Sequence, residues 1–162
     1  MNKAYLLLVI AFLSGCATPY QSSSFSGGYS DSRLGDSIFR VSFEGNGYTK
    51  SARTVDLALL RSAELALQND FKYFVVVSND SKTSYSSFST PHTTTTTGTV
   101  NMYGNNGAVN THSVTSGGQT YLISKPSTTN IIACFKKKPK GSGAVYDASF
   151  IVQSLRAKYR VY

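Results

Sequence analysis

The amino-acid sequence predicts an α+β fold, in which two helices pack on one face of a small antiparallel or mixed sheet with a Ser/Thr-rich hairpin insertion. Three observations support this prediction. Apolar and polar residues alternate over residues 37–44, as in a half-buried strand. Apolar residues recur at helical spacing over residues 51–69 and again near the C-terminus. The order strand, helix, strand, polar insertion, strand, helix is typical of a two-layer arrangement.

The first strand and the first helix follow from local patterns. The expected inward side chains of the strand are Phe39, Val41 and Phe43. Gly45-Asn46-Gly47 ends the strand with residues that tolerate positive φ. Thr49 or Ser51 is expected to cap the helix, which runs to about Asn69. Its expected apolar positions are Val55, Leu59, Ala63, Ala66 and Leu67.

Two further strands and a helix complete the expected core. Residues 71–77 are almost continuously apolar, which predicts a central strand covered on both faces. Residues 130–136 form a second apolar run, in which Cys134 is either a small core residue or a thiol for an intermolecular disulfide. A last helix is expected from residue 144 or 147 to residue 159. Its expected inward side chains are Phe150, Ile151, Leu155 and Tyr159.

The segment over residues 81–129 has a different composition from the rest of the chain. It contains 22 Ser or Thr among 49 residues and few large aliphatic side chains. One interpretation is disorder, and the other is a set of extended strands, since Thr favours strands. An O-glycosylated stalk is a third alternative. The dipeptide Asn106-Gly107 predicts a hairpin turn, and we expect a mobile, partly strand-forming hairpin arm.

The N-terminus has the organisation of a bacterial lipoprotein signal peptide over residues 1–15. Lys3 provides the charged region, and residues 4–12 form an apolar run too short to span a bilayer as a helix. Leu13-Ser14-Gly15-Cys16 then reads as a lipobox. Cleavage between Gly15 and Cys16 would leave Cys16 carrying S-diacylglycerol and N-acyl chains, palmitate among them. The alternative is an ordinary signal peptide, or a buried N-terminal helix, that happens to contain a cysteine.

The residues after the predicted anchor indicate how the chain is attached and sorted. Ala17 follows Cys16 where inner-membrane lipoproteins carry aspartate, so we expect an outer-membrane address facing the periplasm. Residues 16–32 are rich in Ser and Gly, which predicts a lipidated flexible tether. Residues 33–162 are then expected to form a single α+β domain that contains the insertion.

Basic residues are concentrated in the last quarter of the chain. The net charge is +8, and from residue 125 onward there are eight basic residues against one acid, Asp147. A possible patch for anionic ligands consists of Lys136, Lys137, Lys138 and Lys140. The alternative interpretation is a solvated charge run. Nucleic acid is not an expected partner, because an exported lipoprotein would rarely meet it.

No familiar catalytic motif occurs in the sequence. It contains no Gly-x-Ser-x-Gly elbow, P-loop, paired-cysteine zinc motif or His-Glu-x-x-His sequence. His92 and His112 both lie in the insertion without neighbouring acids, and a metal site there would need further ligands. We therefore expect a protein that is not an enzyme and holds no cofactor or metal.

Several segments together resemble a known group of proteins. They are Gly27-Gly28-Tyr29-Ser30, Phe39 to Thr49 with its Gly-Asn-Gly-Tyr-Thr string, Leu59 to Leu65, and the closing Cys134-Phe135-Lys136. This set is similar to a family of small proteobacterial outer-membrane lipoproteins. The resemblance implies anchorage through the lipobox cysteine, and the family carries no established activity or catalytic residues.

Taken together, these patterns predict a membrane-anchored lipoprotein that acts as a non-catalytic structural or interaction module of the cell envelope. The expected partner is an envelope protein or glycan, bound through a sheet edge or the Thr-rich arm. The alternative is a module that binds peptidoglycan or anionic envelope glycans or lipids through the basic C-terminal quarter.

Overall fold

The computed structural model describes residues 17–141 and 143–162 and has the predicted α+β class. The chain divides into two compact units. The core unit contains the described residues up to Ser84 and those from Ser124 onward, and the hairpin unit contains Tyr85–Ile123. Each unit is described by itself below. The predicted signal peptide, Gly15 and Cys16 lie outside the described residues.

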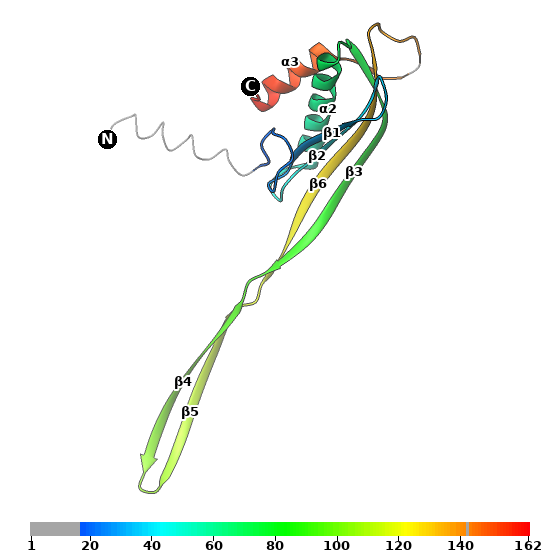
Figure 1. The fold of residues 1–162 in the computed structure, drawn as a ribbon. Helices are drawn as coiled ribbons and strands as arrows, with labels where there is room; N and C mark the ends of the chain where they lie inside the picture. The colour runs from blue at the N-terminus through cyan, green and yellow to red at the C-terminus, as the bar shows by residue number, and fades with distance from the viewer. Residues whose placement is uncertain (1–16, 142) are drawn as a thin grey trace, which may run out of the picture. The chain divides into compact units, whose positions relative to one another are not determined.

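Within the described residues, the core unit contains a five-stranded sheet with the strand order β1-β2-β6-β3-β7 (Figure 1). Its strands are β1 (Gly28–Arg33), β2 (Ile38–Glu44), β3 (Tyr73–Ser89), β6 (Thr120–Phe135) and β7 (Val145–Asp147). β1 pairs with β2, β2 with β6, and β3 with β7, all antiparallel. The β2–β6 register places Ile38 opposite Ala133, so a strand from the first part of the sequence pairs with a strand from the last part.

Helices α2 (Ser51–Gln68) and α3 (Ala148–Tyr159) lie on the same face of this sheet. The core between the layers is apolar and fully or nearly fully buried. Its largest members are Phe39, Val41 and Phe43 of β2, Leu57 and Leu60 of α2, Phe74 of β3 and Ile132 of β6. The alternation predicted for residues 37–44 is therefore confirmed. Burial of side chains of this size contributes roughly 1.5–3 kcal/mol each.

The helix ends differ in part from the prediction. Lys50 occupies the N-cap position of α2 without a side-chain hydrogen bond, so neither Thr49 nor Ser51 caps this helix. The Thr49 hydroxyl instead lies 2.9 Å from the Asn46 side-chain oxygen and 3.0 Å from the Thr18 hydroxyl. In α3, the Asp147 side chain caps the helix by accepting from the Phe150 backbone N–H.

Strand β3 is covered on one face only, which corrects the expectation of a strand buried on both. Phe74 is fully buried, whereas Val77 is 65% exposed. The reason is that both helices pack on the same side of the sheet, so the β3 side chains that alternate with Phe74 face away from the core.

In α3, Phe150 is not an inward residue, because it is 65% exposed. The packed row consists of Ile151, Leu155 and Tyr159, which are four residues apart and therefore lie on one helix face. Phe150 lies five residues before Leu155, on a different face. Val55 and Leu67 of α2 are also more exposed than predicted, at 38% and 40%.

The residues that follow the predicted anchor do not form a tether in the structure. Thr18 is fully buried, and its backbone N–H donates to the Thr49 hydroxyl at 3.0 Å. Gly28–Arg33 forms β1, which pairs along its whole length with β2. Backbone pairing and buried hydroxyl bonds thus order a Ser/Gly-rich segment that has little apolar surface of its own.

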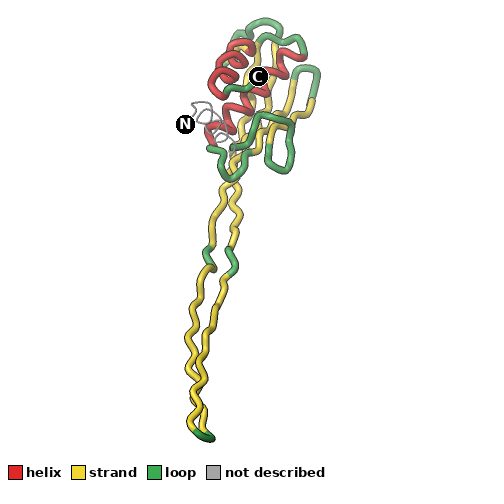
Figure 2. The backbone as a smooth tube through the Cα atoms, turned by 90° about the vertical axis from the view of Figure 1, so that its left-hand side faces the viewer, coloured by secondary structure: helices red, strands yellow, loops and turns green. Residues whose placement is uncertain are grey.

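The hairpin unit contains strands β4 (His92–Tyr103) and β5 (Asn106–Gly117), paired antiparallel (Figure 2). A hairpin is therefore present, but its two-residue loop is Gly104-Asn105 and not Asn106-Gly107. Gly104 has φ +60°, as the first loop position of a tight hairpin turn requires. This register places Val100 opposite Val109, a favourable β-branched pair that a turn at residues 106–107 would separate.

Candidate functional site

The predicted lysine patch lies in the loop that follows β6 and precedes β7. Lys136, Lys137, Lys138 and Lys140 are all exposed. None of their ammonium groups forms an ion pair with another described residue. The chain therefore presents four positive charges within five residues, and this loop, called the basic loop below, can attract an anionic surface or ligand.

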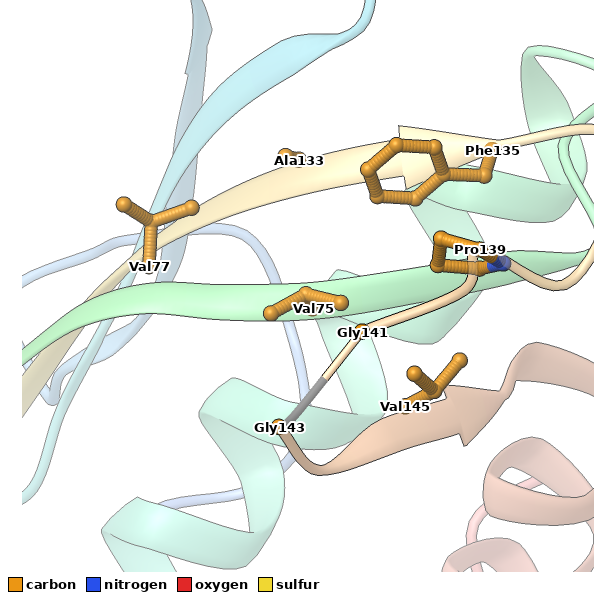
Figure 3. A pocket seen from close by; sticks show the side chains of 8 residues that line it. All are labelled: Val75, Val77, Ala133, Phe135, Pro139, Gly141, Gly143 and Val145. Carbon is orange, nitrogen blue, oxygen red and sulfur yellow. The ribbon is translucent and has the colours of Figure 1, made fainter.

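An apolar hollow of about 240 Å³ lies next to the basic loop (Figure 3). Its walls come from three strands and the loop: Val75 and Val77 of β3, Ala133 and Phe135 of β6, Val145 of β7, and Pro139. These strand residues belong to the sheet face opposite the helices. Lys138 and Lys140, the sequence neighbours of Pro139, are exposed, so an apolar hollow lies beside a cationic loop. That combination suits a ligand with an apolar part and a negative charge.

Sequence reasoning identified the lysines but not the hollow beside them. The available signal was the alternation of Ala133 and Phe135 with the buried Ile132 and Cys134. That alternation divides the side chains of β6 between two faces, but it does not reveal which face the helices cover. The hollow exists on the face that the helices leave uncovered, so it could not be predicted from the alternation.

A buried carboxylate joins the N-terminal segment to both helices. Glu64 of α2 is 7% exposed and accepts a hydrogen bond from the Tyr20 hydroxyl at 2.5 Å. Arg156 of α3 donates to it twice, from Nη2 at 2.8 Å and from Nε at 3.2 Å. Arg61 of the same helix is also near Glu64, with Nη1 at 3.5 Å, and it pairs with Asp31 at 2.9 Å.

This arrangement, the Glu64 cluster, is suited to holding the fold together. Burial and the hydrogen bond to Glu64 raise the pKa of Tyr20 well above its ordinary value. The Tyr20 hydroxyl therefore stays protonated and continues to donate. A carboxylate that already accepts three hydrogen bonds is a poor general base, because most of its lone pairs are occupied.

Cys134 is a free cysteine in the core, 2% exposed, as its buried-residue interpretation predicted. Burial raises the pKa of its thiol from 9.0 to about 11. Since the thiolate is the reactive form, this residue is a poor nucleophile at neutral pH.

The two histidines lie in the hairpin unit on different strands. His92 of β4 is opposite Gly117, and His112 of β5 is opposite Thr97. Because successive residues alternate between faces, the two imidazoles project from opposite faces of the hairpin. Within residues 17–141 and 143–162, there is no group of three or more His, Cys, Asp or Glu placed to hold a metal ion.

The hairpin unit has an unusual surface for a paired β-structure. Every residue of β4 and β5 is exposed. No Lys, Arg, Asp or Glu occurs between Thr83 and Ser124. Hydroxyl groups pair across the strands, Thr94 with Thr115 and Thr96 with Ser113, both at 2.8 Å. Since β4 and β5 are the only members of their sheet in the described chain, each has one edge available for another strand.

Comparison with protein-family models, with curated proteins and with solved structures found no match to the chain. Among the described residues, no helix has the length and apolar character needed to cross a membrane.

Proposed function

We propose that the chain is an outer-membrane lipoprotein, anchored through Cys16 and facing the periplasm, that acts as a non-catalytic interaction module of the cell envelope. The hairpin unit is its binding element. The observation that carries this proposal is the fully exposed, uncharged pair of strands β4 and β5, each with one free edge. Free strand edges bind other chains by backbone hydrogen bonding.

The chemistry of the core unit supports a role without catalysis. Its buried carboxylate, Glu64, is occupied by three donated hydrogen bonds, and its free thiol, Cys134, is buried and protonated at neutral pH. Neither group is available to a substrate. The ordered segment around Thr18 places folded structure within two residues of the proposed lipid anchor.

The anchor is tested by mass spectrometry of the mature N-terminus. We expect a chain that begins at Cys16 and carries acyl chains, with a Cys16→Ala variant as the unmodified control. An unmodified Cys16 in the wild-type chain would contradict the lipoprotein assignment.

The binding element is tested by photo-crosslinking in living cells. A photoreactive amino acid replaces Val100 of β4 in one variant and Gln153 of α3, which is also exposed, in the matched control. We expect specific crosslinked products from position 100 and not from position 153. Recovery of free monomer from both positions would contradict an interaction module.

A second candidate function rests on the basic loop and its neighbouring hollow. In this alternative the chain binds peptidoglycan or anionic envelope glycans or lipids. The apolar floor formed by Val75 and Phe135 favours an anionic lipid or lipid-linked glycan over peptidoglycan. Cosedimentation with purified sacculi and with anionic lipid vesicles, across a salt series, compares binding to peptidoglycan with binding to anionic lipid.

The matched variants for this alternative exchange lysines at different places. Lys136, Lys137 and Lys138 are replaced together by Ser, and the exposed Lys50, Lys82 and Lys125 are replaced in the control. If the basic loop binds the ligand, only the first set lowers binding. Equal binding by both variants would exclude this function.

A further inference from the structure

We infer that the partner of the hairpin unit is a second copy of the same unit, paired edge to edge through β4. This inference rests on the proposed function, since it names the partner of the proposed binding element. The resulting sheet has the order β5-β4-β4-β5, with the two copies related by a twofold axis. Such symmetric pairing is the commonest form of self-association.

The edges of the core sheet are protected, whereas those of the described hairpin sheet are not. Edge strands of stable proteins are protected by charges, by short length or by covering segments. At one edge of the core sheet, β1 carries Asp31 and Arg33, and Ser22 bridges to Tyr29. At the other edge, β7 has only three residues. β4 and β5 have 12 residues each and no charged side chain.

A two-stranded hairpin is marginal in water, and three or more strands are usually needed. Every residue of β4 and β5 is exposed, so the pair has no buried face of its own. Adding two more strands from a second copy supplies backbone hydrogen bonds along the free edge.

The composition of β4 favours its pairing with a second copy of β4. β4 contains six threonines within seven residues, Thr93 to Thr99, interrupted by Gly98. β-branched residues favour strands, whereas β5 contains two Gly, one Ala and two Asn. Identical strands repel when they carry like charges opposite each other, and β4 carries none.

Hydroxyl groups on neighbouring strands already pair within one copy. Thr94 and Thr115 lie 2.8 Å apart, as do Thr96 and Ser113. Threonines of two β4 strands placed side by side can form the same pairs. Confinement of both copies to one membrane through their anchors raises their effective concentration and favours this contact.

A cysteine scan of β4 tests the pairing and locates the twofold axis. The acylated mature chain is placed in phospholipid vesicles, with a single Cys at each position from 93 to 102 in turn, and is oxidised. The native Cys134 thiol is buried, so it gives little background. We expect disulfide-linked dimer to peak at one position, about tenfold above a Gln153→Cys control, because antiparallel strands bring only opposing residues to about 5 Å.

A flat scan with yields equal to the Gln153→Cys control would overturn the inference. A failure of self-pairing can be distinguished from a failure of the proposed function. If copies do not pair but position 100 crosslinks to another envelope protein in cells, the interaction module stands and the self-pairing does not. If neither crosslink forms, both fail.

Charge reversal provides an independent test in solution. The mature chain with Cys16→Ser keeps every described residue, and Thr95 and Thr97 are both changed to Lys in one variant and to Glu in another. We expect each variant to sediment as a monomer and an equimolar mixture to form the heterodimer, with a twofold increase in mass, because opposite charges now face each other.

The matched control adds the same two positive charges elsewhere, as Gln153→Lys with Ser154→Lys on the exposed face of α3. It should self-associate like the parent chain. Far-UV circular dichroism confirms that each variant retains its helices. Pairing through β4 would be overturned if the lysine variant, measured by itself, still formed dimers. It would also be overturned if the mixture formed no heterodimer.

Discussion

Replacing Thr18 by Val tests whether the residues after the predicted anchor belong to the fold. Val has nearly the shape of Thr but lacks the hydroxyl. The Thr18 hydroxyl donates to the Ser26 carbonyl at 3.0 Å and accepts from the Asn46 backbone N–H at 2.8 Å. A flexible tether would lose nothing through this change, whereas a packed segment would lose both hydrogen bonds.

The expected cost follows from these contacts. Each of the two hydrogen bonds contributes about 1 kcal/mol net, so the free energy of unfolding should fall by about 2 kcal/mol. The Asn46 N–H also lies 3.3 Å from the Thr49 hydroxyl, which limits the penalty of leaving this donor without Thr18. With an m-value of about 2 kcal/mol per molar urea, the unfolding midpoint should fall by about 1 M.

Urea unfolding followed by far-UV circular dichroism provides the assay. Both described helices belong to the core unit, so the helical signal reports its unfolding, and the chain has no tryptophan to follow instead. Thr99→Val, at an exposed position of β4, is the matched control and should change stability by less than about 0.5 kcal/mol. A Thr18→Val midpoint equal to that of the control would refute the reasoning.

Three further outcomes are expected. Glu64→Gln should lower the free energy of unfolding by about 2 kcal/mol in urea titrations, since it weakens the charge-assisted bonds from Arg156. The pKa of Cys134 is raised to about 11, so the folded state keeps a proton that the unfolded chain releases above pH 9. Stability should therefore fall by up to about 1.4 kcal/mol per pH unit between pH 9 and 11, and Cys134→Ala should reduce this slope in thermal melts. Gly104→Val should destabilise the hairpin turn by roughly 1–2 kcal/mol, with faster amide exchange in β4 and β5.

The parts of the fold that depend on local periodicity could be predicted from the sequence. The inward residues of β2 alternate strictly with polar ones, and Cys134 lies in an apolar run, so both were expected in the core. Their burial follows from the chain's own pattern and needs no knowledge of distant contacts. The same holds for the end of α2 near Asn69.

The parts that depend on distant partners could not be predicted. β1 has the sequence GYSDSR, which has no apolar alternation and becomes a strand because β2 pairs with it. Thr18 is buried because Thr49 and Asn46, some 30 residues later, supply its hydrogen bonds. The turn at Gly104-Asn105 was misplaced because two neighbouring dipeptides both suit a turn, and the cross-strand pairs decide between them.

For the candidate surfaces, composition identified the exposed charges of the basic loop. It could not identify the hollow beside Pro139, which exists because both helices cover the other face of the sheet. The free edges of β4 and β5 were likewise visible only once their pairing was known.

The pairing of β2 with β6 has a consequence for the order of folding. Ile38 meets Ala133, so the core sheet closes a loop of more than 90 residues, and contacts so distant in sequence form slowly. β4 and β5 are joined by two residues and can pair within about 1–10 μs, as hairpins do. During synthesis, the hairpin strands can therefore pair while β2 still lacks its neighbour β6, and the core is completed only when the last thirty residues become available.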